Sequence, residues 1–115
     1  MAGDCLFCRI TSRQVPAQIV AEDKYTLAFR DINPQAPTHI LVIPKEHIPS
    51  VSDLSETTAS VMGTLTITAN RLAKQFGVAE QGYRLVVNCG PQAGQTVWHL
   101  HVHLLGGRDL RWPPG

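Results

Sequence analysis

The first part of the chain alternates short extended runs with polar and proline-containing stretches. Residues 18–21 and 25–30 flank a polar stretch, and this pattern predicts a β-hairpin. Residues 39–43 form a β-branched run closed by a proline, as expected of a buried strand. Ahead of these runs, the residues up to Ile10 predict a short helical turn. The turn ends before Pro16, because the residue before a proline favours extended geometry.

The longest regular pattern predicts an amphipathic helix over residues 53–76. Asp53 followed by Glu56 resembles a capping box at its start, while Lys74 and Gly77 supply a positive last turn and a glycine stop. Because its threonines are poor helix formers, packing of the apolar stripe must stabilise this helix. The stripe recurs at helical spacing and consists of Leu54, Val61, Leu65, Leu72 and Phe76.

Two more extended runs, residues 83–88 and 97–105, are joined by a glycine-containing loop and predict two further strands. The sum is an α+β fold: an antiparallel sheet of about five strands, one long helix covering one face, and a short N-terminal helix. At 115 residues the chain fits one domain, residues 1–115.

Composition narrows the function classes. A net charge of +1, with 17% charged residues, gives no sign of the basic surface that binds nucleic acid or an anionic membrane. No leader-like or bilayer-length apolar run occurs, so we expect a cytoplasmic protein without nucleic-acid or membrane partners. Three cysteines form an odd set, which argues against a disulfide framework and for a reducing compartment. Cys89 stands alone and is expected to be a small buried thiol.

The candidate chemistry lies in residues 98–105, which carry three of the five histidines at alternate positions. On a strand, His99, His101 and His103 share one face, and the apolar residues between them, together with Trp98, form the other. One histidine on an apolar run is usually a hydrogen-bonded core residue. Three in register are hard to explain as packing, because each buried imidazole needs partners.

The loop before the histidines favours an anionic ligand. Gly90 and Gly94 allow the backbone to approach a ligand closely, and there is no Asp or Glu between Glu80 and Asp109. A phosphate there meets no local carboxylate. The same absence argues against a metal site made of two histidines and a carboxylate. A glycine-containing loop by itself is only a common connection between strands.

Two segments together resemble the histidine triad (HIT) family: Asp31 to Lys45, and Gly94 to Gly107. The stretch 104–107 and the ending 112–115 resemble its Hint branch of purine nucleoside phosphoramidases. The resemblance covers nearly the whole chain. Dinucleoside polyphosphate hydrolases of the family typically continue past the third histidine with a Pro-Arg pair, which is missing here.

This resemblance implies a hydrolase that cleaves the P–N bond of purine nucleoside 5′-phosphoramidates through a nucleotidyl-histidine intermediate. His101 would be the nucleophile, and neutral imidazole is nucleophilic near pH 7. His103 and His99 would orient or stabilise charge, with His39 near them. The proton for the leaving nitrogen comes either from Thr96 or from a flanking imidazole, and the sequence leaves this open.

The resemblance also implies a nucleotide site and a homodimer that extends the sheet. Asp31 would accept hydrogen bonds from the ribose, although such a residue is otherwise a common turn former. Trp112 would reach the partner's site. The base pocket would be lined by Leu6, Phe7, Ile10, Phe29, Ile32 and Leu41, of which Phe29 and Leu41 equally fit ordinary core. The phosphate would lie among Asn88, Gly94, Gln95, Thr96 and His103.

Cys5 and Cys8 have the spacing of half a zinc site. In some bacterial-type triad proteins such a pair is completed by two histidines, here His47 and His99, and this resemblance implies a structural zinc and no organic cofactor. A redox pair is less favoured because no strand precedes the motif. The remaining alternatives are a non-catalytic nucleotide-binding or scaffolding protein, a dinucleoside polyphosphate hydrolase, and an enzyme whose catalytic zinc is held by the triad histidines.

Overall fold

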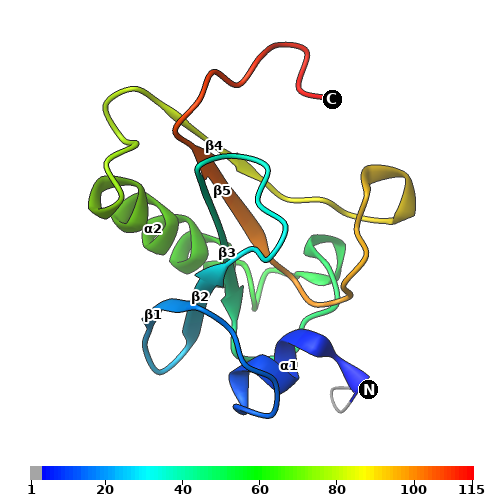
Figure 1. Cartoon of the computed structure of the whole chain (residues 1–115). Coiled ribbons are helices and arrows are strands. Elements are labelled where there is room, and N and C mark those ends of the chain that lie inside the picture. The colour runs from blue at the N-terminus through cyan, green and yellow to red at the C-terminus, as the bar shows by residue number, and fades with distance from the viewer. Residues whose placement is uncertain (1–3) are drawn as a thin grey trace.

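The computed structural model describes residues 4–115 and confirms the α+β prediction. Its five strands form one antiparallel sheet in the order β1-β2-β3-β5-β4 (Figure 1). The elements are α1 (Leu6–Thr11), β1 (Ile19–Glu22), β2 (Thr26–Arg30), β3 (Thr38–Pro44), η2 (Val51–Asp53), α2 (Ser60–Gln75), β4 (Tyr83–Val86), η3 (Pro91–Ala93) and β5 (Val102–Gly106). No helix among the described residues has the length and apolar character needed to cross a membrane.

The sheet has a helix on each face, and Figure 1 shows the two helices well apart. Every residue of β3 is buried, since this central strand is covered on both sides. Its side chains alternate between two clusters: Ile40 and Val42 pack toward α2, whereas Leu41 and Ile43 pack toward α1. His103 pairs with Leu41 across β3 and β5, so the third triad histidine lies on the α1 face.

The long helix is shorter than predicted. It begins at Ser60 rather than at residue 53, and the expected capping box does not form, because Ala59 occupies the N-cap without a side-chain bond. Asp53 instead ends η2, and its carboxylate accepts a hydrogen bond from the Ser50 hydroxyl at 2.8 Å. The C-terminal end differs from the predicted residue 76 by one position, since Gln75 is the last helical residue. Gly77 follows with a positive φ of 75°.

The predicted strand over residues 97–105 is also wrong at its start. Regular pairing begins only at Val102, because the preceding segment leaves the sheet and the Leu100 N–H donates to the carbonyl of Ile48 at 2.6 Å. Trp98 is 49% exposed and is therefore no part of the expected apolar wall. Strand β4 likewise stops at Val86, two residues before the predicted end. The other strand predictions hold to within one residue at each end.

Candidate active site and metal centre

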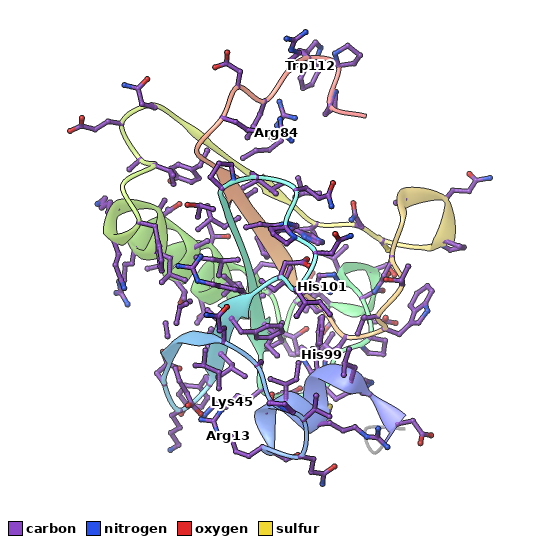
Figure 2. All side chains as sticks on the ribbon, in the orientation of Figure 1. Arg13, Lys45, Arg84, His99, His101 and Trp112 are labelled. Carbon is purple, nitrogen blue, oxygen red and sulfur yellow. The ribbon has the colours of Figure 1, made fainter. Side chains whose placement is uncertain are left out.

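His101 lies just before β5 (Figure 2), and one of its ring nitrogens is hydrogen-bonded to the main chain. Its Nδ1 lies 2.7 Å from the carbonyl oxygen of His99. A carbonyl only accepts, so Nδ1 carries the proton and the lone pair sits on Nε2. The side chain is buried, and this burial lowers the pKa of His101. The ring is thus neutral near pH 7, with a defined nucleophilic nitrogen.

His103 and His39 form a second, directly bonded pair. His39 Nε2 lies 2.9 Å from His103 Nδ1 and 3.4 Å from the Asp31 carboxylate. Burial lowers the pKa of His103 to about 4, and burial also lowers the pKa of His39. The rings of His101 and His103 have centroids 5.0 Å apart. Two neutral imidazoles from different strands therefore stand beside the candidate nucleophile.

His99 faces away from this pair, toward the N-terminal cysteines. Its Nε2 donates to the carbonyl of Pro44 at 2.7 Å, so its Nδ1 keeps the lone pair. That Nδ1 lies 3.3 Å from Cys5 Sγ and 3.6 Å from Cys8 Sγ. His47 Nδ1 lies 3.3 Å from Cys8 Sγ. All four ligand atoms fall within 4.8 Å of one another.

These four residues fit a tetrahedral zinc ion. Zn–S and Zn–N bonds of ordinary length place sulfur and nitrogen ligands about 3.5 Å apart, close to the three observed separations. The Pro44 carbonyl supplies the outer hydrogen bond that orients a ligating histidine. Without an ion, burial raises the pKa of the Cys8 thiol to about 11. A metal would remove this proton, because thiolate is the form that ligates.

The residues expected to line the base pocket lie in three different environments. Phe7 packs edge-on against the rings of both His99 and His101, at centroid distances of 5.9 and 5.1 Å. Leu6 and Ile32 are exposed, the latter by 98%, and their surfaces are open to a ligand. The remaining members lie in the core cluster on the α1 face, where they pack as ordinary core: Ile10, Phe29 and Leu41.

The glycine loop is braced by Gln95. Its carboxamide accepts from the Gly90 N–H at 3.0 Å and donates to the carbonyls of Pro49 and Val97 at 2.9 and 3.2 Å. The side chain is buried, so it holds the loop in shape from within. Gly94 adopts the left-handed conformation at φ 90°, which favours glycine.

Two further residues of the expected phosphate site differ in exposure. Asn88 is half-buried, while Thr96 is exposed. Thr96 borders a cavity of about 450 Å³ that reaches the cysteine–histidine group. The other lining residues are Asp4, Cys5, Leu6, His47, Pro49, Val97 and Trp98.

The structure places three other predicted residues as follows. Asp31 is a turn former, since its carboxylate accepts from the Asn33 N–H at 2.8 Å, and it also reaches His39. Trp112 is 83% exposed, and Figure 2 shows it near Arg84, away from His101. Cys89 is exposed, contrary to the expected buried thiol, because it lies beyond the end of β4 rather than in the sheet.

Two main-chain carbonyls complete the site, and the sequence analysis did not predict either contact. The carbonyls of His99 and Pro44 each fix the proton of one histidine ring. Any residue supplies a carbonyl, so no sequence signal marks these positions. Only a fold that already places Pro44 at the end of β3 reveals the contact with His99.

The chain is similar to known proteins along nearly its whole length. The HIT domain family model matches residues 12–110. An uncharacterised HIT-like protein of Synechococcus elongatus is 52% identical over 115 residues, which cover all of both chains. The crystal structure of a HIT family hydrolase from Legionella pneumophila is 51% identical with a TM-score of 0.95, covering 97% of this chain and 100% of that chain. A histidine triad protein from Clostridium difficile is 42% identical with a TM-score of 0.91, covering 94% of each chain.

Proposed function

The chain belongs to the HIT domain family, and from this membership and the state of its histidines we propose that it is a nucleoside phosphoramidase of the Hint branch. Its substrates are purine nucleoside 5′-phosphoramidates of the adenosine 5′-monophosphoramidate type. The products are a nucleoside monophosphate and an amine. Two similar structures carry the name HIT family hydrolase, which supports hydrolysis in general.

The observation that carries the proposal is the bond from His101 Nδ1 to the His99 carbonyl. It leaves Nε2 as the nucleophile in a ring that is neutral at physiological pH. In the first step Nε2 attacks the α-phosphorus, the P–Nε2 bond forms and the P–N bond breaks. The leaving nitrogen takes a proton from the Thr96 hydroxyl or from a flanking imidazole and departs as the amine.

In the second step water resolves the nucleotidyl intermediate. Its oxygen attacks the phosphorus, the P–Nε2 bond breaks as His101 returns to its neutral form, and the water's proton restores the group that protonated the amine. His103 stabilises charge on the phosphoryl oxygens, and the loop around Gln95 and Gly94 encloses the phosphate. Asp31 binds the ribose hydroxyls. Phe7, Leu6 and Ile32 contact the base, with the buried side chains behind Phe7 supporting its ring.

We further propose that Cys5, Cys8, His47 and His99 hold a structural zinc. Four protein ligands leave no open position for a substrate or a water molecule. The bound ion would cross-link α1 to the end of β3 and fix His99. His99 then serves His101 through its main-chain carbonyl, while its own ring nitrogens are engaged by Pro44 and the metal group.

We also propose a cytoplasmic homodimer. Strand β4 is an edge of the sheet, and its unpaired main-chain groups favour pairing with a second copy. Trp112 lies away from its own His101, which is consistent with a contribution to the partner's site. The three cysteines are free, as expected in a reducing compartment.

The test is intact-protein mass spectrometry after brief reaction with an adenosine phosphoramidate and acid quench. Wild type is expected to gain one adenylyl group transiently, and His101→Ala to gain none while still binding nucleotide. Thr96→Ala separates the proton donors: it keeps the adduct but slows release of a poor leaving amine if Thr96 donates. Absence of both adduct and monophosphate from the wild type refutes the proposal and favours a binding or scaffolding role. Faster cleavage of a diadenosine polyphosphate favours the other hydrolase branch.

A further inference from the structure

A main-chain amide behind the catalytic histidines fixes where their protons sit. The N–H of Gln35, in the loop between β2 and β3, donates to Nδ1 of His39 at 3.0 Å. An amide nitrogen in this position can only donate, so His39 Nδ1 must keep its lone pair. The proton of the neutral ring therefore lies on Nε2. A second proton on His39 Nδ1 would point at the N–H of Gln35, so the hydrogen bond would be replaced by a repulsive contact.

The constraint passes to His103. His39 Nε2 lies 2.9 Å from His103 Nδ1, and since His39 holds its proton at Nε2, His103 Nδ1 is the acceptor. His103 then carries its own single proton on Nε2. Asp31, at 3.4 Å, also faces His39 Nε2 and favours the same proton position. His39 is only 5% exposed, so bulk water does not readily replace these partners.

Gln35, which supplies this amide, is held at its carbonyl by Arg108, two residues beyond the end of β5. Arg108 donates through Nε to the Gln35 carbonyl at 2.9 Å and through Nη1 to the carbonyl of Asp109 at 2.8 Å. The residues after β5 also pack against this loop at a second point. Gly107 lies so close to Pro37 that an added Cβ would be 3.0 Å from the proline ring. The loop that presents the amide is thus fastened to the strand that carries His103.

We propose that the Gln35 N–H and Arg108 are positioning groups that hold His39 and His103 as neutral imidazoles with their protons on Nε2. This inference rests on the proposed function and narrows it. His103 then serves as a fixed hydrogen-bond donor to a phosphoryl oxygen. The His39–His103 pair cannot relay a proton to the substrate, because the Gln35 amide that bonds to His39 does not give up its N–H proton. The proton for the leaving nitrogen must come from elsewhere, and Thr96 is the hydroxyl that remains.

The direct test is two-bond ¹H–¹⁵N NMR of the histidine rings in the full-length protein, from pH 5 to 7.5. Wild type is expected to show His39 and His103 with Nε2 protonated and Nδ1 an acceptor across this range. Gln35→Pro removes the N–H and is expected to let His39 take a second proton in the acidic part of the range. Gln35→Ala is the matched control: it keeps the N–H, loses only the side chain, and is expected to keep the wild-type signals.

Arg108→Ala covers the case in which Gln35→Pro does not fold. It is expected to broaden or shift the His39 signals and to lower kcat by about two- to tenfold, the effect of losing the exposed hydrogen bond to the Gln35 carbonyl, with a smaller change in KM. A wild-type His39 or His103 protonated on Nδ1 overturns the inference. So does an Arg108→Ala variant with unchanged signals and kcat. Because the NMR readout needs no substrate, failure of the phosphoramidase assignment is distinguishable from failure of this one.

Discussion

Gly106, the last residue of β5, is a site where one added methyl group should be costly. It pairs with Thr38 on one neighbouring strand and Tyr83 on the other, so its backbone is held from both sides. A Cβ at this position would lie 2.8 Å from Val78 Cβ and 3.0 Å from both γ-carbons of that side chain. Val78 is itself 5% exposed, and its N–H is bonded to Ala73 at the end of α2.

Neither Gly106 nor Val78 can move easily to relieve this contact. Overpacking a well-packed core costs about 1–3 kcal/mol, and the doubly paired strand places Gly106→Ala in the upper half of that range. For a chain of 115 residues this corresponds to a Tm lowered by roughly 8–12 °C. Since β5 also carries His103, we expect the thermal loss of activity to follow the loss of fold.

The assay is urea denaturation followed by circular dichroism, with the free energy of unfolding taken at a common slope. Gly63→Ala is the matched control, because nothing lies within 4 Å of its new Cβ and alanine gains about 0.5–1 kcal/mol in a helix. Adding Val78→Ala to Gly106→Ala should recover part of the loss. A Gly106→Ala protein as stable as the wild type would refute the packing argument.

Three more predictions concern metal, pH and assembly. Removing bound metal with a chelator should lower the Tm, and Cys8→Ser should abolish zinc in native mass spectra while Cys89→Ser retains it. The folded pKa of His103, about 4, lies below the unfolded value of 6.5, so the unfolded chain binds more protons in this window. Stability should therefore be complete above pH 6.5 and fall by about 1–2 kcal/mol toward pH 4, measured by urea denaturation against His103→Asn. Sedimentation should give twice the 12.6 kDa chain mass, and a single-chain mass would contradict the dimer.

The strands were predictable because their signals are local. Residues 39–43 are rich in β-branched side chains and lie between two prolines, and they form most of β3. The start of α2 was not predictable from the same kind of signal. Asp53 and Glu56 have the spacing of a capping box, but Asp53 is engaged by Ser50 within a preceding turn, and that competing bond depends on local geometry.

The histidine segment shows a different limit of sequence reasoning. Alternation correctly places Val102 and Leu104 in the α2-side core and His103 on the opposite face. It fails for Trp98, because a strand period applies only where the segment stays in the sheet, and the Leu100 N–H bonds to the segment near Ile48 instead. The pairing of His99 with two cysteines more than ninety positions away is a long-range contact that no local pattern contains.

The three triad histidines have the same side chain, yet the hydrogen-bond partner of one ring nitrogen suits each ring to a different proposed role. In His99 a carbonyl holds Nε2 and turns Nδ1 toward the cysteine sulfurs. In His101 a carbonyl holds Nδ1 and leaves Nε2 nucleophilic. In His103 another imidazole donates to Nδ1, so Nε2 becomes a donor. The proposed roles of ligand, nucleophile and donor therefore follow from whether the fixed partner accepts or donates, and from which ring nitrogen that partner contacts. Exchanging any one partner should change the role of that ring without altering the triad sequence.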